Sequence, residues 1–312
     1  MLVLGACSRP VPRSALLTLC LALLLMSLIV VRTAQAGAFT QRIQMASVPA
    51  DASWDDRFGV LGMGYRVYVL APDGQGGLYA GGGFTTAGAV SAPYIARWDG
   101  AAWSGLGTGM DDVVHALVVD GNGNLYAGGT FTMASGVPAN HIAKWNGVSW
   151  SALGSGTNAT VHALLADGNA TLYAGGTFFM AGGVNAADIA QWNGSSWSAV
   201  GLGMNNAVMA LAMDGGGNLY AGGDFGLAGG VLATRIAKWD GANWSPLGLG
   251  MSDAVLTLAV DDGDNLYAGG NFTTVDGEAI PHIAKWSGTS WSALGSGTSD
   301  QVEALAVDAG DV

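Results

Sequence analysis

Short runs of apolar residues alternate with clusters of glycine, asparagine and aspartate along most of this chain, and the whole pattern returns every 47 residues. The string Leu-Tyr-Ala-Gly-Gly begins at Leu78, Leu125, Leu172, Leu219 and Leu266. A period of about 40 to 50 residues is typical of β-propeller blades and of helical solenoids, whose units bury apolar surface against their neighbours. The sequence therefore predicts an array of equivalent structural units.

One repeat, residues 114–160, shows what each unit is made of. Its predicted strands cover 114–119, 125–131, 141–145 and 149–153. Asp, Asn and Gly residues form the turn after the first strand, and Asn146-Gly147 is a tight-hairpin dipeptide between the last two. This glycine density would cost a helix about 1 kcal/mol per glycine, which excludes a helical solenoid. We predict an all-β fold, a β-propeller of four-stranded antiparallel blades.

Aromatic residues recur at fixed places in each unit. Ten of the 11 tryptophans form pairs five residues apart, which begin at Trp98, Trp145, Trp192, Trp239 and Trp286. Tryptophans can form sugar-binding platforms, but aromatic residues repeated in every unit are typical of the core. Because each buried aromatic ring removes about 150–250 Å² of surface from water, these side chains are predicted to hold neighbouring blades together.

The repeat resembles a kelch-type propeller blade at its glycine pair, Gly128-Gly129, and at Trp150 on the predicted outer strand. A closer resemblance, over residues 54–312, is to bacterial secreted repeat proteins with units such as Ile-Ala-Lys-Trp-Asn-Gly-x-x-Trp-Ser-x-Leu-Gly, and to the related repeats of the fungal cortical cell-polarity marker. The resemblance implies a binding or surface module. Galactose-oxidase-type enzymes share the kelch architecture, but their copper site needs a cysteine.

The number of blades follows from the register of the repeat. Five full repeats are predicted at 67–113, 114–160, 161–207, 208–254 and 255–301, and a partial one at 302–312. Residues 54–64 keep an altered last strand. This leading strand and the trailing first strand could share a reduced sixth blade that closes the ring. Alternatively the chain is a fragment of a longer surface protein, which is the interpretation that we favour.

The first 36 residues have the pattern of an export signal. Arg9 and Arg13 precede an apolar run at 15–31, and Ala34-Gln35-Ala36 forms a small-x-small cleavage site. We predict cleavage before Gly37, a lead-in at 37–53, a location outside the cell or on its surface, and no membrane insertion of the mature chain. The alternative is a retained membrane anchor, because 17 apolar-rich positions nearly span a bilayer.

Charge and cysteine content narrow the function classes. Both cysteines lie in the predicted signal, so the mature chain is expected to use no disulfide, thiolate ligand or cysteine nucleophile. All 23 acidic residues follow position 36 and only eight of the basic ones do, so the mature net charge is −15. This sign argues against nucleic acid and anionic membranes as partners.

Differences between the repeats locate the candidate binding site. The residue before the third strand is Tyr94, His141, Asp188, Arg235 or His282. In the loop from the fourth strand to the next first strand, one position holds Asp112, Ala159, Asn206, Asp253 or Asp300. Both loops belong to the same end of the blades, and loops on a rigid scaffold are where binding groups concentrate. The alternative is drift of solvated residues.

Other candidate sites have plainer explanations. The run Asp261-Asp262-Gly263-Asp264-Asn265 is similar to a calcium loop but lacks a downstream bidentate Glu, and turn chemistry accounts for it. His115 and His162 occupy equivalent places on adjacent first strands, where two imidazoles could share a metal, but no third ligand recurs. We therefore predict no cofactor, no metal site and no catalytic residues.

Three functions are open on these grounds. The favoured one is an exported, non-catalytic scaffold that presents its variable loops to an extracellular protein or polysaccharide. The second is a carbohydrate-active enzyme whose carboxylates are Asp112, Asp253 and Asp300, since a glycosidase needs two carboxyl groups about 5 to 10 Å apart. The third is a structural spacer or a fragment of a larger surface protein.

Overall fold

The computed structural model describes residues 62–307. The predicted signal at 1–36, the lead-in at 37–53, residues 54–61 of the altered strand predicted at 54–64, and the chain end at 308–312 lie outside the described residues. Residues 62–306 belong to one compact unit. Within the described range no helix is long and apolar enough to cross a membrane.

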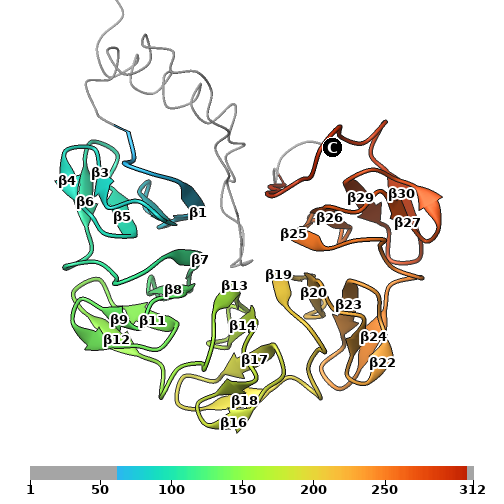
Figure 1. Ribbon diagram of the computed structural model, residues 1–312, viewed down its shortest axis with the longest axis horizontal. Helices are drawn as coiled ribbons and strands as arrows, with labels where there is room; N and C mark the ends of the chain where they lie inside the picture. Colours follow the sequence, from blue (N-terminus) through green and yellow to red (C-terminus); the bar gives the residue numbers. More distant parts are fainter. Residues whose placement is uncertain (1–61, 308–312) are drawn as a thin grey trace, which may run out of the picture. The chain divides into compact units, whose positions relative to one another are not determined.

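The described residues form five antiparallel sheets of four strands, which are the blades of a β-propeller (Figure 1). The innermost strands are β1 (Val67–Pro72), β7 (Val114–Val119), β13 (Val161–Ala166), β19 (Val208–Met213) and β25 (Val255–Val260). The second strands are β2 (Leu78–Gly82), β8 (Leu125–Gly129), β14 (Leu172–Gly176), β20 (Leu219–Gly223) and β26 (Leu266–Gly270). Blades are numbered 1 to 5 in this order.

The outer half of each blade contains the tryptophan pair. The third strands are β5 (Ile95–Trp98), β11 (Ile142–Trp145), β17 (Ile189–Trp192), β23 (Ile236–Trp239) and β29 (Ile283–Trp286). The fourth strands are β6 (Trp103–Gly105), β12 (Trp150–Ala152), β18 (Trp197–Ala199), β24 (Trp244–Pro246) and β30 (Trp291–Ala293). In every blade the strands lie in sequence order from inside to outside. The predicted fold class is confirmed.

A small ribbon in each blade is absent from the sequence-based prediction, which treated the segment between the second and third strands as a loop. The two-stranded ribbons pair β3 (Thr86–Ala87) with β4 (Val90–Ser91), β9 (Met133–Ala134) with β10 (Val137–Pro138), β15 (Met180–Ala181) with β16 (Val184–Asn185), β21 (Leu227–Ala228) with β22 (Val231–Leu232) and β27 (Thr274–Val275) with β28 (Glu278–Ala279). Strands of two residues are too short to leave a period-two pattern that a sequence can reveal.

The glycine pairs allow close contacts, the first glycine with the next blade and the second within its own blade. A Cβ on Gly128 would lie 2.5 Å from Cγ1 of Val161 in the next blade, and a Cβ on Gly129 would collide with the carbonyl oxygen of Val113. Val161 is fully buried. Only glycine leaves room for these two contacts.

In blades 2 to 5 the second tryptophan of the pair connects its blade to the preceding one by a hydrogen bond. Trp150 is buried, and its Nε1 donates a hydrogen bond to the carbonyl oxygen of Leu106, 44 residues earlier. Trp197, Trp244 and Trp291 make the same bond to Leu153, Val200 and Leu247. The first tryptophan is half-buried and packs at 5.3–5.4 Å, ring centre to ring centre, against the second. The expected inter-blade role is confirmed.

The predicted first strand of a sixth unit begins within the described range. Residues 302–307 are not assigned to a strand. Val302 nevertheless lies against Gly269 as Val161 lies against Gly128, and the Leu305 amide donates to Thr257 Oγ1 at 3.2 Å. The segment therefore takes the place of an inner strand beside β25 without a ladder partner among the described residues.

Candidate functional site

The antiparallel order of the strands places two sets of loops at one end of every blade. These are the loop between the second and third strands and the loop from the fourth strand to the next blade. They contact each other: Asp111 Oδ1 accepts hydrogen bonds from the amides of Thr132 and Met133, both at 2.8 Å. Asn158, Asn205 and Ser252 make the equivalent contacts. We call this end, with the eight candidate residues predicted on it, the variable face.

The five residues before the third strand share one backbone conformation. Tyr94, His141, Asp188, Arg235 and His282 have φ between 62° and 68°, in the left-handed region. Hydrogen bonds fix both the backbone amide and the backbone carbonyl of each residue. The His141 amide donates to the carbonyl of Phe131, and the His141 carbonyl accepts from the amide of Gly129. The left-handed region disfavours residues other than glycine, and asparagine, aspartate and histidine are the non-glycine residues that occupy it most often. The backbone is therefore constant here while the side chain varies.

Arg235 is the most strongly held of the five side chains. Its Nη1 lies 2.7 Å from Asp224 Oδ1 and 2.7 Å from the Asp224 carbonyl oxygen. Asn206 Nδ2 lies 3.3 Å from the other carboxylate oxygen of Asp224. Asp224 was not predicted as a site residue. The signal was present in the sequence, because the equivalent positions hold Gly83, Thr130, Thr177 and Asn271 and thus also vary.

Burial perturbs two other candidates on this face. It raises the pKa of the Asp188 carboxyl from its ordinary value to about 6. It also lowers the pKa of His141, against the opposing effect of the Gly129 and Thr130 backbone. In the described chain, Arg235 Nε and Asn271 Oδ1 are buried without a hydrogen-bond partner. Perturbed titratable groups together with unsatisfied polar atoms are features of ligand-binding sites.

The predicted acids of the second loop have a structural role. Oδ1 of Asp112, Asp253 and Asp300 accepts a hydrogen bond from the next backbone amide at 2.7–2.8 Å, and the three side chains are exposed. Tyr65 holds the equivalent position before blade 1, 47 residues ahead of Asp112, and is 63% exposed. The prediction missed Tyr65 although the period reaches it.

The inner strands place an aromatic row near the common centre of the blades. The ring of His115 lies 5.5 Å from that of Tyr68 and 5.4 Å from that of His162. Each of these residues stands at the register shift between its inner strand and the second strand. Among residues 62–307 no group of three or more His, Cys, Asp or Glu side chains could hold a metal ion.

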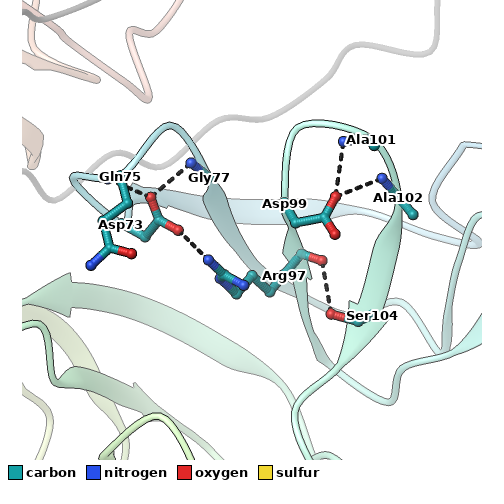
Figure 2. Close-up of polar contacts among 8 residues, drawn as sticks. All are labelled: Asp73, Gln75, Gly77, Arg97, Asp99, Ala101, Ala102 and Ser104. Atoms are coloured by element: carbon teal, nitrogen blue, oxygen red, sulfur yellow. Dashed lines mark hydrogen bonds and ion pairs between the residues drawn. The ribbon is translucent and has the colours of Figure 1, made fainter.

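In the turns at the opposite end of the blades, the aspartate carboxylates accept hydrogen bonds from neighbouring donors. Asp261 accepts from the amides of Gly263 and Asn265, from the Asn265 side chain and from the Tyr267 hydroxyl. These donors occupy the carboxylate oxygens that a calcium ion would need. Figure 2 shows the corresponding turns of blade 1, where Asp73 and Asp99 accept backbone amides in the same way.

A shallow depression opens at this opposite end, between the turns of blades 2 and 3. Asp120, Asn122, Tyr126, Ala170 and Leu172 are among the residues that line it. None of the eight predicted site residues borders it. Burial, aided by the nearby Asp120 charge, raises the pKa of Tyr126 to about 12.

This chain has only low similarity to known proteins. No protein-family model and no curated protein matches the sequence. The extracellular domain of the putative one component system BT4673 from B. thetaiotaomicron is 13% identical, with a TM-score of 0.47 over 70% of this chain. This chain covers only 27% of that structure.

Two further solved structures are similar to a comparable degree. YCF48 bound to D1 peptide is 13% identical with a TM-score of 0.45, over 75% of this chain and 68% of that one. The WD40 β-propeller domain of Doa1 is 12% identical with a TM-score of 0.47, over 67% and 62%. These values assign neither family nor function, and the fold class rests on the sheets described above.

Proposed function

We propose that this chain is an exported, non-catalytic binding scaffold of kelch-like type, whose variable face binds an extracellular protein or polysaccharide. The observation that carries the proposal is that five positions share one left-handed backbone geometry but hold four kinds of side chain. The export pattern at 1–36 and the aromatic repeat support the location and the type.

The strain of the left-handed backbone indicates that the side chains at these five positions have a role. A residue other than glycine in the left-handed region costs about 1–3 kcal/mol and persists where the surrounding structure or a function requires it. Glycine would remove that cost at all five positions, and the chain already uses glycine freely at other left-handed positions. The retained Tyr, His, Asp and Arg side chains are therefore the groups that we assign to ligand contact.

The test replaces two of these side chains by glycine. The double variant His141→Gly and Asp188→Gly should keep or raise the melting temperature, because it relieves left-handed strain and removes a half-buried carboxyl group whose charged form burial disfavours. Binding to the protein or glycan that the wild-type chain selects from surface-protein and glycan panels should fall by about tenfold or more.

A matched control separates contact from backbone flexibility. Ala170→Gly makes the same backbone change at φ 69°, in a turn at the opposite end of blade 3. It should leave binding unchanged. A folded double variant with wild-type affinity would show that the ligand does not use this face, and the absence of any ligand on either panel would count against the proposal as a whole.

A further inference from the structure

At the end of the blades opposite the variable face, an acid, a tyrosine and a cation recur together. The acid is in the turn after the first strand, the tyrosine in the second strand and the cation in the third. Tyrosine and cation are direct partners in the ladder, as Tyr126 and Lys144 are in blade 2. We call this set the cation triad.

Blade 1 has the tightest cation triad. Arg97 Nη2 lies 2.7 Å from Asp73 Oδ2, and the guanidinium carbon lies 5.8 Å from the centre of the Tyr79 ring. Figure 2 shows the Arg97 side chain reaching the Asp73 carboxylate. The arginine thus combines an ion pair with a cation–π contact, each of which favours a positive charge at this place.

Lysine takes the same place in blades 2, 4 and 5. The Nζ atoms of Lys144, Lys238 and Lys285 lie 5.3–5.6 Å from the centres of the Tyr126, Tyr220 and Tyr267 rings. Lys238 and Lys285 also lie 3.9 Å from the carboxylates of Asp214 and Asp261. Four repeats therefore show that this geometry accepts an ammonium or a guanidinium group.

Blade 3 keeps the acid and the tyrosine and lacks the cation. Gln191 stands at the third-strand position opposite Tyr173. Its Nε2 is turned to Ser198 Oγ on β18, at 3.2 Å, and so does not lie over the ring. Blade 3 therefore supplies no positive charge at the position over the Tyr173 ring that a lysine occupies in blades 2 and 4.

The Asp167 carboxylate is also less occupied than its equivalents. Its Oδ1 accepts the amides of Asn169 and Thr171. Thr171 stands where blades 2, 4 and 5 have an asparagine whose side chain binds both carboxylate oxygens. Among the described residues nothing donates to Asp167 Oδ2, and the Tyr173 hydroxyl makes no hydrogen bond.

The surroundings leave this place accessible. Asp167 and Tyr173 are both half-buried, and Tyr173 packs against the cluster that includes Leu211 and Leu219 of blade 4. A half-buried aromatic ring and a half-buried carboxylate thus lie together at the surface, above this buried cluster. The mature chain's net charge of −15 attracts positive groups to it.

We propose that the incomplete cation triad of blade 3 is a binding site for an external alkylammonium or guanidinium group, which pairs with Asp167 and lies over the Tyr173 ring. The group comes either from a small free amine or from a lysine or arginine side chain of a basic protein segment. The site is independent of the variable face.

The test uses a variant that fills the site from within. Gln191→Lys restores the residue type that three other repeats carry, so the variant is expected to fold. The probes are n-butylammonium chloride and a pentalysine peptide, each titrated against sodium chloride of equal ionic strength. Binding is followed through the NMR signals of the Asn169 and Thr171 amides, which donate to Asp167.

The expected result is a saturable shift of both signals in the wild-type chain and a loss of affinity of about tenfold or more in Gln191→Lys. Gln191→Ala leaves the place empty and should retain binding. A peptide that binds at least tenfold more tightly than the amine identifies a basic segment as the source; similar affinities identify a small amine. Equal affinity in wild type and Gln191→Lys, or loss in Gln191→Ala, overturns the proposal.

Discussion

At the scale of the residue, the five left-handed positions of the variable face have the same backbone hydrogen bonds but different side chains. The amide and carbonyl of each left-handed residue are bonded to its own blade, and these bonds are the same whichever residue stands there. Side-chain identity is therefore unconstrained by the ladder. Asp188 shows the consequence most clearly, since burial of its carboxyl works against the charged form.

Asp188→Asn should change how stability depends on pH. The pKa of Asp188 is about 6 in the folded chain against an ordinary 3.8, so the folded state binds more protons between these values. The Asp188 contribution to the free energy of unfolding therefore falls as pH rises from about 4 to 6 and stays low above. The free energy of unfolding of Asp188→Asn minus that of the wild type should therefore be more positive at pH 7.5 than at pH 4.5. Urea unfolding at both pH values measures this difference.

Asp99→Asn is the control with the opposite sign. Amides of Ala102 and Ala101 lower the pKa of Asp99 below 3.8, so its charged form stabilises the fold above that pH and this contribution is lost as pH falls. Asp99→Asn should lose stability relative to wild type as pH rises. The same pH trend in both variants would contradict the assignment of burial as the cause at Asp188.

At the scale of the element, each blade is completed by contacts with its neighbour. The inner half is joined where a valine lies on a glycine, and the outer half where an indole donates to a carbonyl of the preceding blade. The strand order and the tryptophan role could be read from the repeat. The partner of each indole could not, because a hydrogen bond between blades depends on how the two sheets are placed.

Trp197→Phe should remove the outer connection between blades 2 and 3. The Leu153 carbonyl loses its indole donor at 2.8 Å and keeps the Gly156 amide at 3.1 Å, and loss of one such hydrogen bond costs about 0.5–1.5 kcal/mol. Trp192→Phe is the matched control, because the half-buried Trp192 belongs to the same pair and makes no such bond to Leu153. Chemical denaturation should show a larger loss for Trp197→Phe; equal losses would mean that ring volume alone matters.

Gly175→Ala should destabilise the inner connection between blades 3 and 4. The added Cβ would lie 2.5 Å from Cγ1 and 3.0 Å from Cβ of Val208, and Val208→Ala removes the closer of these two contacts. In Gly176→Ala the new Cβ meets the carbonyl of Thr160 instead, which no side-chain truncation can move. A double-mutant cycle in urea should therefore show rescue by Val208→Ala for Gly175→Ala and none for Gly176→Ala.

At the scale of the whole molecule, packing is a chain of nearest-neighbour interfaces. Inner strand β13 contacts β7 and β19, and β19 contacts β25. Each of the buried clusters draws on adjacent blades, as the one that joins Leu165 of blade 3 to Leu211 and Leu219 of blade 4 does. Stability in such an array is close to a sum of unit and interface terms.

Leu211→Ala should reveal this arrangement. Truncating a fully buried leucine costs about 2–5 kcal/mol, and this one lies at the interface of blades 3 and 4. In native-state hydrogen exchange, amide protection should fall in blades 3 and 4 and change least in blade 1. A uniform loss in all blades would instead mean that the molecule opens as a single cooperative unit.

The sequence by itself determined the period, the strand order and the aromatic core, because turn residues, short apolar runs and invariant spacings act locally within one repeat. Tertiary structure alone decided three features: the pairing of Arg235 with Asp224, the shared left-handed conformation on the variable face, and the orientation of Gln191 away from Tyr173. Each of these features depends on the path of the backbone and on the positions of side chains in three dimensions. These positions result from packing across the whole fold and cannot be read from one repeat of the sequence.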